Sequence, residues 1–331
     1  MTTRRMLAIA SLCLIAAAIL TFATVRWASN PPQAVCLLPE GELLMYVNLQ
    51  PLHFFDSKTS NSINLDPDYQ AFIDQTNIRF ERDLDQVAIS MHNPGAEAET
   101  SSIFRGRFDL NKLQSYFQKL TTGSEKYGEK TIFSIVHEGR TVRVCILDKS
   151  EVAVTNMASA EPMHSVIDKF RHPARADRGP LLAQSYYPYV PFFSAAWLVY
   201  RVPSQPGRAQ LPEGLSFDFL QNTTGVISLR LPLWLSSECR FKAEVFTESD
   251  AAAEEVAESA HNYLALYRSI AQSLGTKGGD RDVRKAFDSI QVEQKENRAI
   301  FTAAISQAFL KKIASAAQTG IQEPPLPGKN P

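Results

Sequence analysis

The feature that most constrains this chain is an uncharged hydrophobic run from Met6 to Val25. Its twenty residues would form a helix about 30 Å long, which matches the hydrocarbon core of a bilayer. Arg4 and Arg5 before the run favour a cytoplasmic N-terminus, and Trp27 after it suits the far interface. We therefore expect a single-pass anchor in the inner (cytoplasmic) membrane, with the bulk of the chain, residues 28–331, outside the cytoplasm.

A cleaved secretory signal is the alternative for this segment. Signal peptides usually have a hydrophobic region of about 7–15 residues that ends at a small-x-small cleavage site. The nearest candidate, Thr21-Phe22-Ala23, has a poor first position. Lipoprotein processing fits less well, because Cys13 follows a leucine and Cys36 follows a valine where a small residue is needed. Either an anchor or a signal would export the remaining chain.

The composition indicates a packed globular chain rather than a disordered one. Hydrophobic residues make up 44% of the 331 residues and aromatic residues 10%. The net charge is −1, so no long-range field attracts the chain to nucleic acid, and we expect no nucleic-acid partner. The cysteines form no disulfide framework or metal pair. Cys239 lies in a stretch where polar and apolar residues alternate, so its thiol shares one strand face with apolar side chains. This pattern indicates a buried and unreactive thiol.

Periodicity predicts two series of strands and helices. In the first, strands are expected at 43–49, 87–91, 104–108, 131–137, 141–148 and 151–156, with helices at 67–77, 110–120 and 160–171. In the second, strands are expected at 195–201, 225–231, 238–246, 288–294 and 298–305, with helices at 249–274 and 307–317. Both series are interpreted as a lone strand followed by two hairpin–helix units, with variation in the first series.

This order predicts an α+β fold built from two similar hairpin–helix halves. Strands with one apolar and one charged face favour antiparallel sheets with helices packed on one face. The predicted segments are an anchor (1–28), a linker (29–35), a first half (36–172), a Pro- and aromatic-rich connection (173–193), a second half (194–317) and a disordered Pro-rich tail (318–331).

The sequence contains none of the catalytic or metal-binding motifs that we looked for. The nearest approach to a phosphate loop, Gly123 to Thr131, has Glu129 where a lysine is required and runs from a helix into a strand. The acidic runs Asp66-Pro67-Asp68 and Glu81 to Asp85 are interpreted as caps and turns, and His164 with Asp168 as a surface contact. We therefore expect no catalytic residue, no metal ligand and no cofactor.

An aromatic segment in the connection is the candidate binding site. Six aromatic rings lie between Tyr186 and Trp197. Our hypothesis is that four of them, Tyr186, Tyr187, Tyr189 and Trp197, border a ligand or partner groove, with Phe192 and Phe193 buried beneath. The alternative is that all six rings join the two halves.

These observations favour a non-catalytic binding or scaffolding protein of the cell envelope, anchored in the membrane through residues 6–25, with other envelope proteins as partners. The alternative is an envelope hydrolase, or another enzyme, whose active site the sequence does not reveal.

Overall fold

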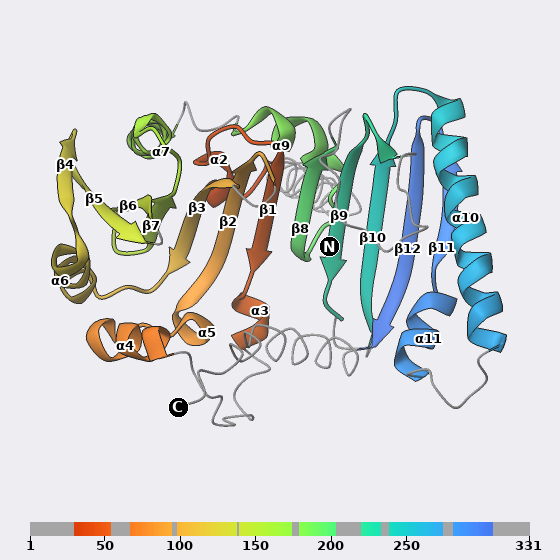
Figure 1. The fold of residues 1–331 in the computed structure, drawn as a ribbon, viewed down its shortest axis with the longest axis horizontal. Helices are drawn as coiled ribbons and strands as arrows, with labels where there is room; N and C mark the ends of the chain where they lie inside the picture. Colours follow the sequence, from red (N-terminus) through yellow and green to blue (C-terminus); the bar gives the residue numbers. More distant parts are fainter. Residues whose placement is uncertain are drawn as a thin grey trace, which may run out of the picture. The chain divides into compact units, whose positions relative to one another are not determined.

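The computed structural model describes residues 30–53, 67–94, 98–137, 139–173, 179–202, 220–232, 238–273 and 281–306 (Figure 1). The predicted anchor, the predicted helix at 307–317 and the predicted tail lie outside these residues. Within the described ranges, no helix is long and apolar enough to cross a membrane.

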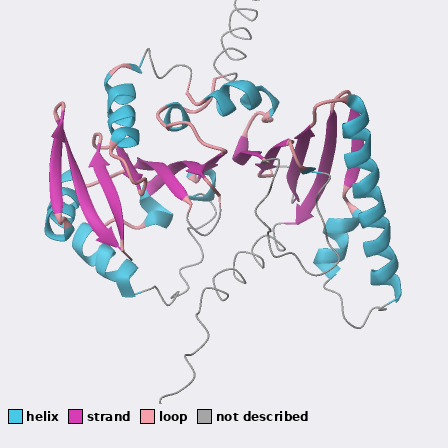
Figure 2. Ribbon diagram, turned by 45° about the horizontal axis from the view of Figure 1, so that its top comes forward, coloured by secondary structure: helices cyan, strands magenta, loops and turns pink. Residues whose placement is uncertain are grey.

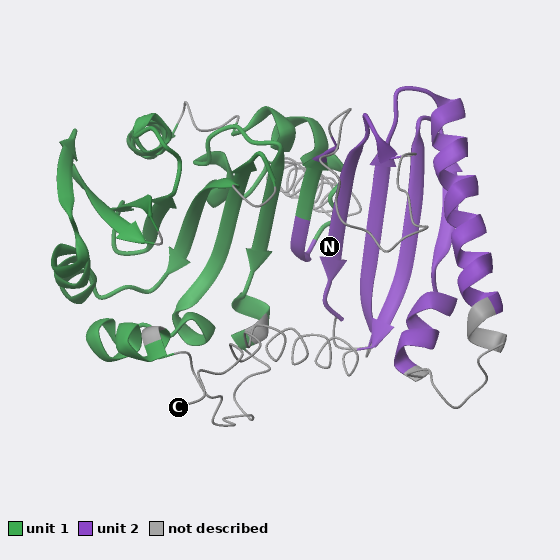
Figure 3. Cartoon of the chain, viewed as in Figure 1, with its two compact units in different colours: residues 1–192, 198–200 green, residues 193–197, 201–331 purple. Residues whose placement is uncertain are grey.

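The chain has an α+β fold with antiparallel strands and several helices, as the sequence predicts. It divides into two compact units, Met1–Phe192 with Leu198–Tyr200, and Phe193–Trp197 with Arg201–Pro331 (Figure 3). Strand β8 (Ser194–Arg201) contributes residues to both units.

The first unit contains seven strands in the order β1-β2-β3-β7-β6-β5-β4, among the residues described. Each neighbouring pair is antiparallel. Their bounds are β1 Leu43–Asn48, β2 Leu84–His92, β3 Glu99–Gly106, β4 Gly123–Tyr127, β5 Lys130–His137, β6 Arg140–Ile146 and β7 Glu151–Thr155. The predicted strands are all present, whereas β4 was not predicted.

The helices of this unit are α2 Gln33–Cys36, α3 Gln50–His53, α4 Pro67–Thr76, α5 Phe80–Asp83, α6 Leu110–Leu120, α7 Glu161–Arg171 and α9 Leu181–Tyr186, followed by the 3₁₀ turn η2 Tyr187–Tyr189. Asp109 caps the N-terminus of α6, because its carboxylate accepts hydrogen bonds from the N–H groups of Asn111 and Lys112. Residues 33–36, assigned to the end of a linker and the start of the first half, instead form α2, where Ala34 and Val35 are fully buried.

Helices cover both faces of the first unit's sheet (Figure 2). On β5, the Phe133 ring lies 6.1 Å from the Phe117 ring of α6. The Lys130 ammonium lies 5.6 Å from the centre of the Phe170 ring of α7. Positions 130 and 133 point to opposite faces, because side chains alternate along a strand. The prediction of helices on one face is therefore wrong for this unit.

The physical reason is that the central strands are apolar on both sides. On β6, the neighbours Val144 and Cys145 are 4% and 0% exposed, although they face opposite ways. On β7, Val152 and Ala153 are 6% and 1% exposed. Val144 and Val152 pack with Leu113 of α6 in one core cluster. Their neighbours Cys145 and Ala153 point to the other face of the sheet, so their burial requires cover on that face.

The second unit contains β9 Thr224–Arg230, β10 Glu238–Phe246, β11 Gln291–Lys295 and β12 Arg298–Ser306, with α10 Asp250–Ser273 and α11 Arg281–Asp288. The strand order is β11-β12-β10-β9, and the pairs are antiparallel. Val256 and Ala257 of α10 pack against Ala299 of β12. Helix α11 was not predicted, and its Phe287 ring stacks on Tyr267 of α10 at 4.0 Å.

The two units connect their strands in a comparable order. In the first, the hairpin β2–β3 leads into α6, and a later strand, β7, returns to pair with β3. In the second, β9–β10 leads into α10, and β12 returns to pair with β10.

Candidate functional site

The residues of the predicted groove lie in different environments. Tyr186 ends α9, and Tyr187 and Tyr189 belong to η2, all in the first unit. Trp197 lies on β8 in the segment that is grouped with the second unit, and it is only 3% exposed. Tyr189 is 39% exposed, whereas Tyr186 and Tyr187 are half-buried. Trp197 is therefore a core residue, and the groove along the tyrosines stays a prediction.

Phe192 and Phe193 are exposed, which corrects the expectation that they lie buried beneath the tyrosines. They are 57% and 85% exposed. Phe193 has a φ of 61°, in the left-handed region that bulky residues rarely adopt. This turn leads into β8 and places both rings ahead of the strand rather than in its core. Leu181 (64% exposed) and Tyr189 are also exposed.

The backbone at Gly179 and Leu181 is fixed to α2 and to the loop that follows it. Gly179 has a φ of 52°, and a Cβ atom there would lie 3.2 Å from the Cα of Cys36. The N–H group of Leu181 donates to the Glu40 carboxylate at 3.1 and 3.0 Å. Leu182 and Ala183 of α9 are buried. The backbone that carries the exposed Leu181 side chain is therefore held against α2 and its following loop.

A polar cluster lies on the same side of the first unit. It consists of Cys36 on α2, Tyr46 on β1, Arg105 on β3, Glu151 on β7, Lys169 on α7 and Tyr187 on η2. Burial raises the pKa of Tyr46 to about 12, with Tyr187 adding to the shift and Arg105 opposing it. Burial also raises the pKa of Tyr187, and Cys36 adds to this shift. Both phenols are therefore protonated at neutral pH.

Burial also shifts the pKa values of Lys169 and Glu151 towards their uncharged forms. Burial lowers the pKa of Lys169, against the opposing influence of Glu40 and Cys36. Its ammonium donates to the carbonyl oxygen of Leu38. Burial raises the pKa of Glu151, which Arg105 opposes and Asp148 reinforces.

The Glu151 carboxylate is buried without a hydrogen-bond donor among the described residues. The residue is 2% exposed, and neither carboxylate oxygen has a hydrogen-bond partner among the described residues. The nearest cation, Nη1 of Arg105, lies 3.7 Å from Oε1, which is too far for a hydrogen bond. Glu244 of the second unit, also 2% exposed, instead accepts from Lys242 and from Arg298, the latter at 3.0 Å.

Two surface hollows among the described residues lie elsewhere. One, of about 210 Å³, is lined by Gln75, Asn111, Lys112, Ser115, Tyr116 and Lys119. The other, also of about 210 Å³, is lined by Gln221, Asn222, Thr223, Thr247, Glu248, Ala252 and Glu255. Neither hollow includes a residue of the predicted groove.

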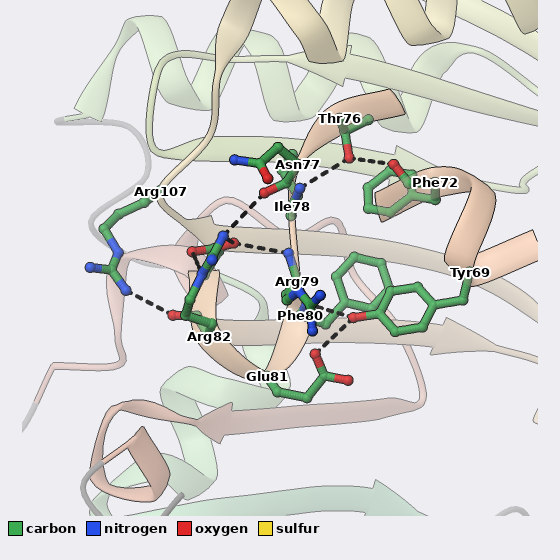
Figure 4. Close-up of polar contacts among 11 residues, drawn as sticks. Tyr69, Phe72, Thr76, Asn77, Ile78, Arg79, Phe80, Glu81, Arg82 and Arg107 are labelled. Carbon is green, nitrogen blue, oxygen red and sulfur yellow. Dashed lines mark hydrogen bonds and ion pairs between the residues drawn. The ribbon is translucent and has the colours of Figure 1, made fainter. Parts of the chain in front are cut away.

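The acidic run from Glu81 to Asp85 has a structural role at Asp83, as the turn interpretation predicts, and Figure 4 shows the neighbouring residues Arg79, Glu81 and Arg82. The Asp83 carboxylate accepts from the N–H group of Arg79 at 2.9 Å and from the Arg82 guanidinium at 2.8 and 2.7 Å. Burial alone would raise the pKa of Asp83, but these hydrogen bonds hold it below its usual range. The hydroxyl of Tyr69 donates to Glu81 at 2.9 Å. Asp66 and the side chain of Asp68 lie outside the described residues.

His164 and Asp168 of α7, interpreted from the sequence as a surface contact, each contact a residue of β4. His164 contacts Glu125 of β4 at 2.9 Å and stacks on Tyr127 at 4.0 Å. The Tyr127 hydroxyl donates to Asp168 at 2.9 Å. The segment that was rejected as a phosphate loop thus forms β4 and its turn, which bind α7.

The described part of the chain contains no group of three or more His, Cys, Asp or Glu side chains placed to bind a metal ion. Three cysteines, Cys36, Cys145 and Cys239, are buried. Cys239 is 1% exposed, which confirms its predicted burial.

No family model matches the chain, and no curated protein matches it. Among solved structures, the chain is similar to crystal form III of TP0453, with 13% identity, a TM-score of 0.45 and coverage of 86% of this chain and 99% of the other. Crystal form IV of TP0453 gives 13% identity, a TM-score of 0.44 and coverage of 88% and 99%. Crystal form I of TP0453 gives 12% identity, a TM-score of 0.41 and coverage of 86% of this chain and 98% of the other. These values assign neither a family nor a function.

Proposed function

We propose that this chain is a membrane-anchored binding or scaffolding protein of the cell envelope, with its folded units on the extracytoplasmic side. The observation that carries the proposal is the uncharged run of twenty residues, Met6 to Val25, with two arginines before it. Eight residues separate Val25 from the buried Ala34 of α2. At no more than about 3.6 Å per residue, they hold the first unit within about 30 Å of the end of the anchor.

The proposed contact region is the aromatic segment from Leu181 to Phe193. Tyr186, Tyr187 and Tyr189 remain the proposed border of a groove for a ligand or an envelope partner, now without Trp197, which is buried. Exposed apolar side chains that cluster along one segment typically mark an interaction site. The packing of Gly179 on α2 supports this assignment, because a preorganised surface loses little entropy on binding.

We also propose that the two units derive from one repeated motif of lone strand, hairpin, helix and second hairpin. The support is the shared connectivity, in which β7 returns to β3 as β12 returns to β10. The helix predicted at 307–317 would correspond to α7, but it lies outside the described residues.

The polar cluster favours an enzyme as the second candidate function. Ionisable groups with shifted pKa values often gather at active sites, and Glu151 and Lys169 are such groups. An envelope hydrolase would need a substrate to reach Glu151, which is 2% exposed. An activity screen on the full chain and on Glu151→Gln tests this candidate, because a hydrolase using Glu151 would lose its activity in the variant.

A reporter that is active only after export, fused behind Pro331, tests the proposed function. We expect reporter activity in cells, and the fusion should remain with the membranes after an alkaline wash. Activity confined to the cytoplasm, or release of the whole fusion by the wash, would contradict a membrane-anchored extracytoplasmic protein.

A further inference from the structure

Two arginines stand directly opposite each other on neighbouring strands of the second unit. Arg230 is the last residue of β9, Arg240 lies on β10, and the strand register pairs them. Side chains that are paired across antiparallel strands point to the same face of the sheet, with Cβ atoms about 4.5–5.5 Å apart. Like charges at such positions destabilise a sheet, so the strand pairing gains nothing from these two charges.

The neighbouring cations on this face, in contrast, share an acidic partner. Lys242 follows Arg240 by two residues and therefore points to the same side of the sheet. Its ammonium donates to Glu244, which is 2% exposed, and the Arg298 guanidinium of β12 donates to the same carboxylate at 3.0 Å. Glu244 thus already faces two cations and offers no counter-charge to the arginine pair.

Neither arginine of the pair has an acidic partner among the described residues. No ion pair or hydrogen bond joins the guanidinium of Arg230 or Arg240 to any residue that the structure describes, and this includes Glu238, two residues before Arg240 on the same strand face. Arg230 is half-buried, whereas Arg240 is exposed. A half-buried cation that lacks a counter-ion favours a bound anion.

We propose that Arg230 and Arg240 bind a phosphate group between them. A guanidinium presents its N–H donors as a planar fork, which matches two oxygens of one anion. Two forks side by side therefore need three or four oxygens on one centre, which a phosphate supplies and a carboxylate, with two oxygens, does not. The bound negative charge also offsets the repulsion between the two guanidinium groups. Free phosphate and a phosphate ester share this chemistry.

The backbone that carries the site is already fixed in the free protein. Strand β10 pairs with β9 on one side and with β12 on the other. Groups on paired strands hold their positions better than groups on loops, so less entropy is lost when the anion binds. Both arginines belong to the second unit, so the site is independent of the proposed membrane anchor and of the proposed groove along Tyr186, Tyr187 and Tyr189.

Isothermal titration calorimetry of the full chain, in detergent at neutral pH and low ionic strength, tests the site. The probes are inorganic phosphate, glycerol 3-phosphate and acetate. We expect phosphate to bind the parent protein, and Arg230→Gln or Arg240→Gln to weaken its affinity at least about tenfold. Arg240→Lys keeps the charge but loses the fork, so its loss should be smaller. Arg268→Gln is the matched control, because it removes an exposed arginine of α10 and should leave the affinity unchanged.

Thermal melting separates a lost site from a misfolded variant. Since each substitution to glutamine removes one of two repelling charges, both variants should keep at least the parent's Tm without phosphate, and phosphate should raise the Tm of the parent but not of these variants. Tighter binding of glycerol 3-phosphate than of inorganic phosphate assigns the site to an ester, and the reverse order assigns it to free phosphate.

Four results would overturn the phosphate site. They are a parent protein that binds neither phosphate, acetate that binds as tightly as phosphate, parent-like affinity in both Arg230→Gln and Arg240→Gln, and a Tm of either variant well below that of the parent, which would show a structural role for the arginine instead.

Discussion

Replacing Glu151 with glutamine is expected to stabilise the first unit at neutral pH. The carboxylate is 2% exposed and has no hydrogen-bond donor among the described residues. The attraction of Arg105 across 3.7 Å amounts to about 4–5 kcal/mol at an effective dielectric constant of about 20. Burial of the ion costs several kcal/mol and dominates, because the pKa of Glu151 is raised. We expect Glu151→Gln to add roughly 1–2 kcal/mol to the free energy of unfolding at pH 7.

The pH dependence of the free energy of unfolding tests the sign of this effect. A carboxyl group whose pKa is raised on folding contributes its full stability below the unfolded value of about 4.3, and loses it as the pH rises through the folded value. The advantage of Glu151→Gln should therefore vanish near pH 4 and grow towards pH 7. Calorimetry of the detergent-solubilised chain measures it, at roughly 2–4 °C in Tm for each kcal/mol.

Glu244→Gln is the matched control for this substitution. Glu244 is equally buried but accepts hydrogen bonds from Lys242 and Arg298. Its replacement removes the negative charge that both cations face and turns one of the two acceptor oxygens into an amide NH2 group, so it should lower the free energy of unfolding by about 1–3 kcal/mol at pH 7. A Glu151→Gln variant that is less stable than the parent protein at pH 7, or equally shifted at every pH, would refute the reasoning.

Four further substitutions test hydrogen bonding and packing elsewhere in the first unit. Asp83→Asn should lower the free energy of unfolding by about 1–3 kcal/mol at pH 7, and calorimetry should show the difference shrinking as the pH falls through the lowered pKa of the carboxyl group. Gly106→Ala should destabilise strongly, because its Cβ would lie 2.1 Å from the Asp83 carbonyl oxygen. Gly123→Ala, with nothing within 4 Å, should leave Tm nearly unchanged. Gly179→Ala should cost about 1–3 kcal/mol and raise protease sensitivity of the 181–193 segment, because it combines a positive φ with a close contact to Cys36.

The sequence predicts the regular elements well where the local signals are strong. Strand β10 has the predicted bounds, 238–246, because polar and apolar residues alternate through most of it. Strand β4 was missed because its residues are almost all exposed, so no apolar alternation marks it. Helix α11 was missed because it is short and rich in charged residues.

The candidate site depends on tertiary contacts that local patterns do not encode. Glu151 opens a strand, where a charged residue is expected to face water, but the register places it opposite Arg105 and inside the unit. Phe192 and Phe193 have the composition of a core, and a turn with a positive φ exposes them instead. The polar cluster draws on six elements between α2 and η2, so no spacing in the sequence brings its members together.

The central claim is that the folded units stay joined to a membrane anchor. Intact-mass spectrometry of the protein extracted from alkaline-washed membranes tests it most directly, because the mass reports whether residues 6–25 are still present. The account predicts that the membrane-retained species contains the hydrophobic run from Met6 to Val25. A mature species that begins after Val25 would show a cleaved signal and contradict the anchor.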